Sequence, residues 1–366
     1  AELLFFRGAV ENKFNQSRES INSLEQFINH ADKQTDAILL MDSYEMLADN
    51  YLKIFQYQKA AQTYSFILEK FKSRLDSAKI ADYQNYTKFR ALSEVPPQTT
   101  SIKEKSIIER QGGRVPIHFG QQVFPLGFDT GANFSIITAS LADKFGFKII
   151  DETIEVSSIT GDKIDASFGV SPEMTIGKAT ISNAIFLVFE DKHLYITEAD
   201  HQINGVIGFP VISALKEITF LKSGEIIVPA KPGSAHNQNM CLDELTPLIA
   251  GKYKGNRLIF SFDTGANKSD LYPPFFEAYK DEIADNFSSF TKTLRGVGSR
   301  REVKAYRMED FEIEFSGKKA YFSEIPVLTE PTIESSRYLY GNLGRDLVNQ
   351  FEKMNLNFVS MSLVFE

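Results

Sequence analysis

The spacing of hydrophobic residues divides the chain into a helical first part and a β-rich remainder. In residues 43–71, SYEMLADNYLKIFQYQKAAQTYSFILEKF, apolar side chains recur every three or four positions, and neither Gly nor Pro interrupts them. This spacing predicts amphipathic helices. From about residue 101, short runs rich in β-branched and aromatic residues alternate with Gly, Asp, Asn and Lys, which is typical of strands and turns. We therefore predict an all-α domain followed by an all-β region.

Two polar segments that contain proline interrupt these patterns. EVPPQTT (94–100) and PAKPGSAHNQN (229–239) have the composition of linkers. A chain of 366 residues is also too long for one small core. The predicted domains are therefore residues 1–95, 101–230 and 240–366.

The helical segment 43–71 resembles a tetratricopeptide repeat. Ala48 and Ala60 are 12 residues apart (60 − 48), where small side chains suit a close helix crossing. An earlier partial copy lies around Gly8, Ser20 and Leu24, and Gly8 precedes Ala48 by 40 residues (48 − 8). This period exceeds the usual 34, so two ordinary helical hairpins are the alternative interpretation.

Composition and charge narrow the classes of function. Hydrophobic residues make up 43% of the chain and charged residues 24%, as in ordinary globular proteins. The net charge of −8 and the absence of a Lys/Arg block argue against a nucleic-acid partner. No apolar run is long enough to span a bilayer. The five histidines show no metal-ligand spacing, and Cys241 has no neighbouring Cys or His motif, so we expect no metal and no cofactor.

The β-rich region contains one string twice. FDTGAN occupies residues 128–133 and 262–267, so Asp129 and Asp263 are 134 positions apart (263 − 129). A Gly-X-apolar-Gly element follows in each half, with Gly208 and Gly344 separated by 136 positions (344 − 208). Two motifs that keep their spacing predict two homologous lobes in tandem.

Two glycine-containing features accompany each copy. A turn is expected before each aspartate, at Gly120 and at Gly251. A hairpin tip is expected between each aspartate and the second motif, at SITGDK (158–163) and RGVGSR (295–300). These tips are candidate flaps, because glycine permits the bending that opening over a substrate requires.

Each half resembles one lobe of a retropepsin-like aspartic protease. In that family the Asp-Thr-Gly-Ala loop follows an apolar strand, as in PLGFDTGA and LIFSFDTGA here, and an apolar-apolar-Gly element precedes a short helix, as in VIGFPVI and NLGRDLV. The Gly-Arg-Asp at 344–346 is close to the retroviral form, whereas Gly-Phe-Pro at 208–210 is a variant. The resemblance covers about residues 110–366 and implies a bilobal all-β fold with both lobes in one chain, as in pepsin-like enzymes.

The resemblance implies an aspartic endopeptidase that activates a water between Asp129 and Asp263. One carboxylate takes the proton of the water while the other, protonated, donates to the carbonyl oxygen, and the pair shares one proton because both cannot ionise cheaply. The implied support of the two loops is Thr130, Gly131, Ala132, Thr264, Gly265, Ala266, Gly208 and Gly344. The implied flap and substrate-binding positions are Ile159, Thr160, Gly161, Gly296, Val297 and Gly298.

The two halves differ directly after their shared string. Phe134, Ser135 and Ile136 follow the first copy, and Lys268, Ser269 and Asp270 follow the second. The second hairpin tip carries Arg295, Arg300 and Arg301, whereas the first carries Asp162. We expect a cleft of asymmetric charge that favours acidic substrate residues on the side of the second lobe.

A polypeptide substrate and a monomer with both lobes in one chain are therefore expected. The alternative is a catalytically degenerate peptide-binding or scaffold protein that uses the same cleft and the helical domain. A protein partner for the helical domain is also an open interpretation. Compartment is left open, and an exported or periplasmic bacterial protein is the favoured interpretation.

Overall fold

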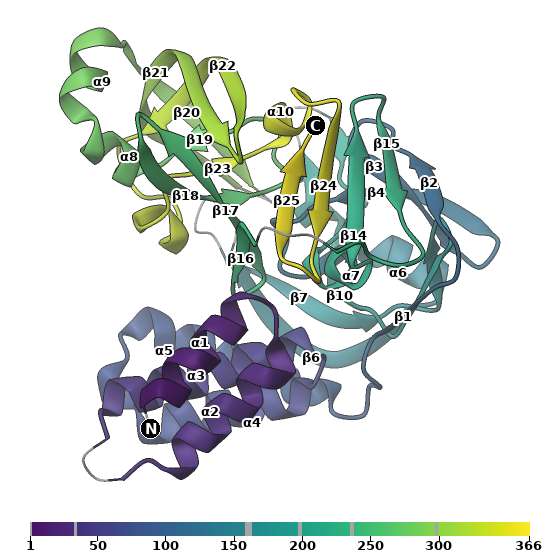
Figure 1. The fold of residues 1–366 in the computed structure, drawn as a ribbon. Helices are drawn as coiled ribbons and strands as arrows, with labels where there is room; N and C mark the ends of the chain where they lie inside the picture. The colour runs from purple at the N-terminus through teal and green to yellow at the C-terminus, as the bar shows by residue number, and fades with distance from the viewer. Residues whose placement is uncertain (1, 33–34, 158–162, 197–199, 235–237, 297–298) are drawn as a thin grey trace.

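The computed structural model describes residues 2–32, 35–157, 163–196, 200–234, 238–296 and 299–366. It has an N-terminal helical region and a large β-rich part, as expected (Figure 1). None of the described helices is long and apolar enough to cross a membrane.

The helical region forms two antiparallel hairpins followed by a third, shorter segment. Its elements are α1 (Glu2–Lys13), α2 (Ser17–Asn29), α3 (Ala37–Lys53), α4 (Tyr57–Lys70), η1 (Lys72–Arg74), α5 (Ser77–Tyr86) and η2 (Thr87–Leu92). Asp36 and Asp76 cap α3 and α5 by accepting backbone N–H groups, which satisfies donors that the first helical turn leaves free. A Cβ added to Gly8 would lie 2.7 Å from the Leu24 side chain, so the first hairpin is closely packed at this glycine.

The first β-rich half is built on a ten-stranded sheet. Its order is β1-β9-β8-β3-β4-β13-β5-β10-β7-β6. The strands are β1 (Thr99–Ile102), β3 (Arg114–Phe119), β4 (Gln122–Phe128), β5 (Ser135–Thr138), β6 (Lys148–Ser157), β7 (Lys163–Val170), β8 (Met174–Ile176), β9 (Ala179–Ser182), β10 (Ile185–Phe189) and β13 (Gly205–Ile207). Helix α6 (Ala139–Phe145) follows β5, and a small pair, β11 (Tyr195–Ile196) and β12 (His201–Gln202), precedes β13.

The second half is built on an eight-stranded sheet. Its order is β16-β17-β18-β23-β19-β22-β21-β20. The strands are β16 (Met240–Asp243), β17 (Thr246–Tyr253), β18 (Asn256–Phe262), β19 (Asp270–Leu271), β20 (Ser289–Gly296), β21 (Ser299–Phe315), β22 (Lys318–Leu328) and β23 (Gly341–Leu343). Helices α8 (Pro273–Ala278) and α9 (Lys280–Asn286) follow β19.

The two sheets share one strand arrangement. The run β3-β4-β13-β5-β10-β7-β6 in the first has the same order as β17-β18-β23-β19-β22-β21-β20 in the second. The directions agree as well: β4 with β13 and β18 with β23 are parallel, and β13 with β5 and β23 with β19 are antiparallel. Each half therefore brings the string FDTGAN to the end of an equivalent central strand.

A third sheet joins the halves. Its five strands, β2-β15-β14-β24-β25, combine β2 (Ser106–Glu109), β14 (Glu217–Leu221) and β15 (Glu225–Val228) with β24 (Lys353–Asn357) and β25 (Ser362–Phe365). In Figure 1 the yellow β24 and β25 lie beside the teal β14. Helices α7 (Phe209–Ala214) and α10 (Arg345–Val348) lead from the central strands towards this sheet. One hydrophobic core runs through both halves.

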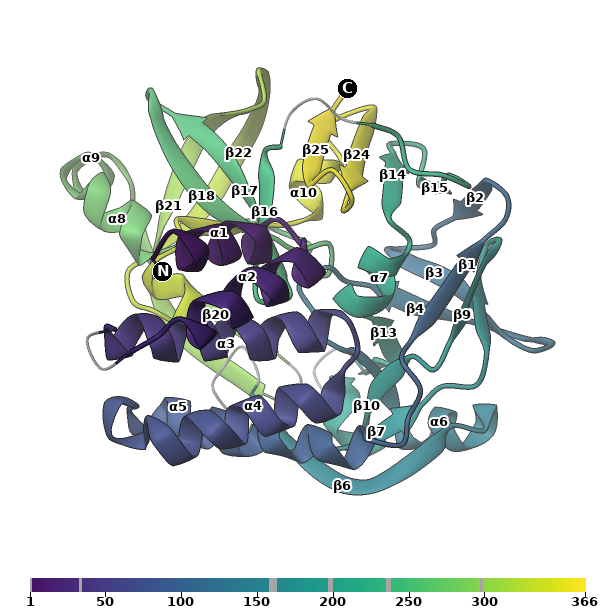
Figure 2. The same ribbon diagram turned by 60° about the horizontal axis from the view of Figure 1, so that its bottom comes forward.

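The helical region packs against the first sheet on strand β10. All five residues of this strand, IFLVF, are buried. Phe186 and Val188 belong to the core of the two halves, whereas Ile185, Leu187 and Phe189 belong to the core shared with the helices. Because successive strand residues face opposite sides, the unbroken apolar run reflects two separate cores. Figure 2 shows the helices beside this part of the sheet.

The helices also contact the second half and strand β7 of the first half. Lys13 forms an ion pair with Asp243 at 2.6 Å, and Asn15 donates to the carbonyl of Phe358 at 3.3 Å. On the other side, Phe89 lies 5.1 Å from Phe168, measured between ring centroids. The helical region is therefore anchored to both halves.

One expected turn lies elsewhere. Gly120, with a φ of 59°, occupies the turn between β3 and β4 as expected. Gly251 instead lies inside β17, and the turn before the second aspartate is Lys254–Gly255, with φ values of 47° and 85°. A Cβ on Gly251 would come within 2.7 Å of Ile313, so this glycine serves packing rather than a turn.

Candidate active site

The two DTGA loops meet at the junction of the halves. Asp129 directly follows β4 and Asp263 directly follows β18. The Asp129 N–H donates to the carbonyl of Ile207 at 3.0 Å, and the Asp263 N–H donates to the carbonyl of Leu343 at 2.9 Å. Each loop is thus held by the strand that carries the second motif of its own half.

The threonines cross-link the loops beneath the aspartates. The hydroxyl of Thr130 accepts the Thr264 N–H at 3.0 Å, and the hydroxyl of Thr264 accepts the Thr130 N–H at 3.1 Å. Each hydroxyl also donates to the opposite strand, Thr130 to the carbonyl of Phe262 at 2.9 Å and Thr264 to that of Phe128 at 2.7 Å. Both threonines are buried, so four shielded bonds fix one loop against the other.

The glycines allow each carboxyl to lie over the opposite loop. A Cβ added to Gly265 would lie 2.2 Å from Oδ2 of Asp129, and one added to Gly131 would lie 2.6 Å from Cγ of Asp263. Within each loop the glycine N–H donates to its own aspartate Oδ1, at 2.8 Å in both. The absence of a side chain at these two positions is therefore required for the carboxyls to approach each other.

The environment of Asp129 favours its protonated form. Burial raises the pKa of this carboxyl well above its ordinary value, and the negative charge of Asp263 and a hydrogen bond with Asp263 act in the same direction. Hydrogen bonds from the backbone of Gly131 and Ala132 oppose the shift. Two carboxyls in such proximity titrate as a pair that holds one proton over a wide pH range.

The second motif supports each loop in the same way. The N–H of Gly208 donates to Oγ of Ser135 at 3.0 Å, and that of Gly344 donates to Oγ of Ser269 at 3.0 Å. A Cβ on Gly208 would lie 2.4 Å from the carbonyl carbon of Phe134, so only glycine fits there. The carbonyls of Ala132 and Ala266 accept the N–H groups of the residues after these glycines.

The supports differ in their side chains. Asp346 accepts from the N–H of Ser269 at 2.9 Å and from its hydroxyl at 2.6 Å, and Pro210 occupies the corresponding position after Gly208. The variant Gly-Phe-Pro therefore lacks one carboxylate support but keeps the glycine–serine bond.

A hydrogen bond to one aspartate also distinguishes the halves. Nδ2 of Asn342 donates to Oδ2 of Asp263 at 3.2 Å, and the hydroxyl of Ser261 donates to Oδ1 of Asn342 at 2.7 Å. In the first half, Val206 pairs with Gly127 at the same place, so neither residue offers a side-chain donor to Asp129.

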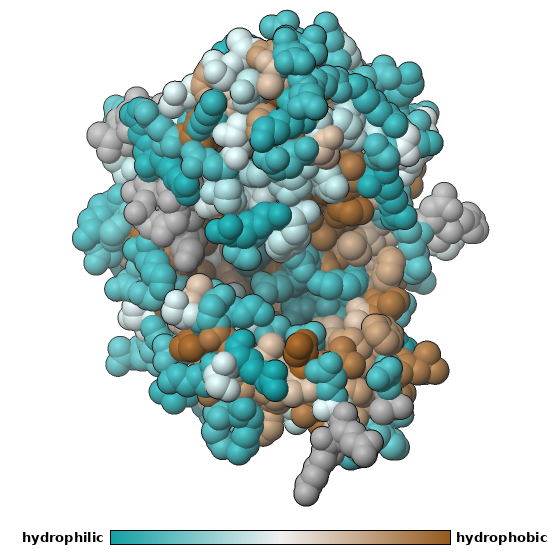
Figure 3. Space-filling view, turned by 90° about the vertical axis from the view of Figure 1, so that its left-hand side faces the viewer, coloured by the Kyte–Doolittle hydropathy of each residue, from teal (hydrophilic) through white to brown (hydrophobic). Residues whose placement is uncertain are grey.

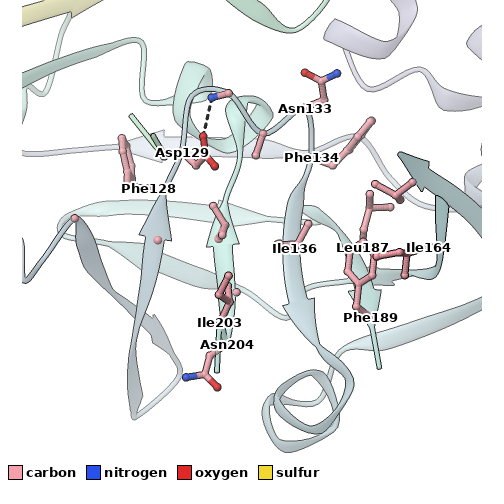
Figure 4. A pocket seen from close by; sticks show the side chains of 18 of the residues that line it. Phe128, Asp129, Asn133, Phe134, Ile136, Ile164, Leu187, Phe189, Ile203 and Asn204 are labelled. Atoms are coloured by element: carbon pink, nitrogen blue, oxygen red, sulfur yellow. Dashed lines mark hydrogen bonds between the residues drawn. The ribbon is translucent and has the colours of Figure 1, made fainter. Parts of the chain in front are cut away.

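A pocket of about 840 Å³ opens beside Asp129, within the size range of ligand sites. Figure 4 shows Ile164, Leu187 and Phe189 grouped along one wall, with Phe134 and Ile136 between them and Asp129. The helical region contributes Asp82, Asn85 and Tyr86 to the lining, and the second half contributes Gly265, Asn267 and Arg345. The pocket is thus mainly a feature of the first half, walled by α5.

The molecule also shows a hollow on the side that is at the left of Figure 1. Figure 3 shows this face, with hydrophobic surface bordering hydrophilic surface around the hollow.

Three of the charges expected to make the cleft asymmetric have partners. Asp270 forms an ion pair with Lys292, Arg300 lies 2.8 Å from Glu302, and Arg301 lies 3.9 Å from Glu330. Paired charges attract a substrate less than free ones, so these contacts weaken the expectation of an acidic substrate. Asp162 lies outside the described residues, and the structure does not describe the side chain of Arg295.

The proposed flaps are described only in part. Strands β6 and β7 pair as one antiparallel hairpin, and β20 and β21 pair as another. Gly296 ends β20. The positions Ile159, Thr160, Gly161, Val297 and Gly298 lie outside the described residues.

Sequence reasoning missed three groups of residues at this site. Ser135 and Ser269 lie at the same distance after each aspartate (135 − 129 = 269 − 263), a signal that could have revealed them. Asn342 stands inside the second motif where the first has Val206, at the position that the Gly-X-apolar-Gly pattern leaves variable. The contribution of α5 to the pocket has no local sequence signal.

No metal centre accompanies the aspartates within the described part of the chain, where no three His, Cys, Asp or Glu side chains gather in a way that could hold an ion.

Comparison with known proteins agrees with the first half of this site. Residues 115–211 match the family model for an aspartyl protease. The matched range includes Asp129 and Gly208 and ends before Asp263. No curated protein gives a significant match to the chain. The match supports a likeness to the retropepsin-like aspartyl proteases over this range and suggests, in general terms, the hydrolase activity of an aspartic protease.

Proposed function

We propose that the protein is an aspartic endopeptidase with a single composite site formed by Asp129 and Asp263. The observation that carries the proposal is the reciprocal contact of the two DTGA loops, in which each carboxyl lies over the glycine of the other loop. A lone turn aspartate would cap its own loop and would need no such partner. Two facing carboxyls are the arrangement that activates a water for amide hydrolysis.

The mechanism follows from the shared proton. The ionised carboxyl takes a proton from the water, whose oxygen attacks the peptide carbonyl carbon. The protonated carboxyl donates its proton to the carbonyl oxygen. The tetrahedral intermediate then expels the amine as the first carboxyl passes the water's proton to the amine nitrogen, and a hydroxyl of the intermediate returns a proton to the second carboxyl. The threonine cross-links keep both carboxyls in position, which matters because a misplacement of about 1 Å can cost 100-fold in rate.

The domain arrangement supports the proposal. We propose a helical domain at 1–95 and two lobes at 101–230 and 240–366, since the two sheets share their strand order. The matching spacings Gly8–Ser20 and Ala48–Ala60 support tetratricopeptide-like hairpins in the helical domain. With both loops in one chain, a monomer holds the complete site.

The pocket supports a polypeptide substrate with a large apolar side chain near the bond that is cut. The pocket that opens beside Asp129 is lined by aliphatic and aromatic residues from β5, β7 and β10. Because α5 forms part of this lining, the helical domain takes part in substrate binding in this proposal.

The test is cleavage of an unfolded protein between pH 3 and 7, with and without pepstatin. We expect the wild type to cut, pepstatin to inhibit it, and Asp129→Asn and Asp263→Asn each to lose activity. Asp281→Asn, on the exposed surface of α9, is the matched control and should retain it. A wild type that cuts at no pH, or an aspartate variant that cuts normally, would refute the proposal. Pepstatin binding without cleavage would instead favour a peptide-binding protein.

A further inference from the structure

The second half carries a polar chain behind its aspartate that the first half lacks. It runs from Ser261 to Asn342 to Asp263, with distances of 2.7 Å from Oγ to Oδ1 and 3.2 Å from Nδ2 to Oδ2. Ser261 is buried and also lies 3.3 Å from the carbonyl of Gly341. The hydroxyl therefore orients the amide so that its N–H₂ group faces the carboxylate.

The strand pairing explains why only one half has this chain. Asn342 pairs with Ser261 across β23 and β18, as Val206 pairs with Gly127 across β13 and β4. The next residues, Leu343 and Ile207, are fully buried in the core. Because alternate strand residues face opposite sides, Asn342 and Val206 both face away from this core, and the difference between the halves is one of chemistry rather than backbone.

We propose that Asn342 is a positioning residue that places the negative charge of the pair on Asp263 and the shared proton on Asp129. A hydrogen bond donated to a carboxylate favours its ionised form. Asp263 receives the amide of Asn342 in addition to the N–H groups of Gly265 and Ala266. This inference rests on the proposed peptidase function, in which Asp263 is then the base and Asp129 the acid.

The surroundings of Asp129 agree with this assignment. The neighbouring Val206 offers no donor, and burial favours the neutral carboxyl of Asp129.

Other titratable groups lie near the pair. In the second half, burial keeps the pKa of the Tyr272 hydroxyl high, and the charges of Asp270 and Asp263 act in the same direction. This hydroxyl therefore stays neutral in the pH range of the test. The other charged or titratable groups of the pocket are Asp82, Tyr86, Arg114, Glu155, His201 and Arg345.

The experiment replaces Asn342 by the residue that the first half has. In Asn342→Val all those surrounding groups are unchanged, and the ionised form of Asp263 loses one donor. The acidic limb of the pH profile of kcat/KM should move to higher pH by about one to two units, the shift expected for a hydrogen bond to a charged group. Ser261→Ala should move the acidic limb in the same direction by less. Ser261→Thr keeps the hydroxyl and should leave the acidic limb at its wild-type position.

Asn355→Val is the matched control. This asparagine lies in β24, where its amide donates to Glu217 and Thr219, and its loss should leave the acidic limb in place. A merely structural role of Asn342 would lower kcat equally at all pH values. If Asn342→Val is active and the acidic limb of its pH profile does not move, the inference is overturned.

A second readout does not need turnover. The carboxyl carbons of ¹³C-aspartate report ionisation directly, with Asp129→Asn and Asp263→Asn assigning the two signals. In the wild type Asp263 should ionise first, and in Asn342→Val its ionisation should move to higher pH. Ionisation of Asp129 before Asp263 would refute the assignment, whereas absence of cleavage would refute only the peptidase function.

Discussion

The cross-link between the two DTGA loops can be tested by removing one hydroxyl. Thr264→Val keeps the shape of the side chain but removes Oγ1. Two bonds are lost: the Thr130 N–H loses its acceptor at 3.1 Å, and the carbonyl of Phe128 loses its donor at 2.7 Å. Both groups are shielded from water, because Thr130, Thr264 and Phe128 are all buried.

The magnitude follows from these two orphaned groups. An unsatisfied buried donor or acceptor costs about 1–3 kcal/mol, so the two together cost about 2–6 kcal/mol. Loss of an exposed hydroxyl bond should cost less than about 1 kcal/mol. Thr329→Val provides that comparison, since its hydroxyl donates to the carbonyl of Lys304 at 3.1 Å on the surface.

The assay is urea unfolding followed by the β-sheet signal in circular dichroism. We expect the free energy of unfolding of Thr264→Val to fall by at least about 1 kcal/mol more than that of Thr329→Val. Thr130→Val should behave like Thr264→Val, because its hydroxyl also makes one accepted and one donated bond. Equal stabilities for the buried and exposed variants would show that the cross-link does not hold the halves together.

Three further predictions concern the loops and the helical region. Gly265→Ala places a Cβ 2.2 Å from the Asp129 carboxyl and should lower kcat/KM about 100-fold or more, whereas Gly233→Ala, whose Cβ would lie 3.5 Å from its nearest neighbour, should not. Burial raises the pKa of Asp129 above its ordinary value of 3.8. The protonated carboxyl therefore contributes fully to the stability of the folded protein below pH ~4, and this contribution is lost as the pH rises through the raised pKa. The Tm of Asp129→Asn relative to wild type should therefore increase from pH 4 to 7, and a constant difference would contradict the shift. The Asn85 side chain donates a hydrogen bond to the Glu155 carbonyl at 2.6 Å and accepts one from the Glu155 N–H at 2.9 Å. Asn85→Ala should therefore speed hydrogen exchange at the Glu155 amide. Unchanged exchange would show that α5 does not restrain β6.

The candidate site could be predicted because its backbone requirements are local. Gly131 and Gly265 must lack a Cβ for the opposing carboxyls to fit, and Gly208 and Gly344 must lack one to pack on the loops. Such requirements leave short strings at fixed spacing in the sequence. The helical region was predictable for a similar reason, since its buried positions recur with helical spacing in α3 and α4.

Long-range pairing left no such trace. The joining sheet depends on β14 pairing with β24, residues 217–221 with 353–357, and nothing near either strand specifies the other. The wall that α5 gives to the pocket depends on Phe89 packing against Phe134 and Phe168. A buried aromatic residue after a helix predicts a packed face, but the sequence does not say which surface it meets.

The two halves show which features a composite site needs twice and which it needs once. Geometry must be matched on both sides, so the glycines, the threonines and the serines at 135 and 269 occur in both halves. Charge must be unmatched, because a pair that shares one proton works only if one carboxyl is ionised and the other is not. Two differences lie in the second motif, Asn342 opposite Val206 and Asp346 opposite Pro210, and of these Asn342 is the one that contacts a carboxyl of the pair. In our proposal, the difference between Asn342 and Val206 decides which of the two similar loops supplies the base and which the acid.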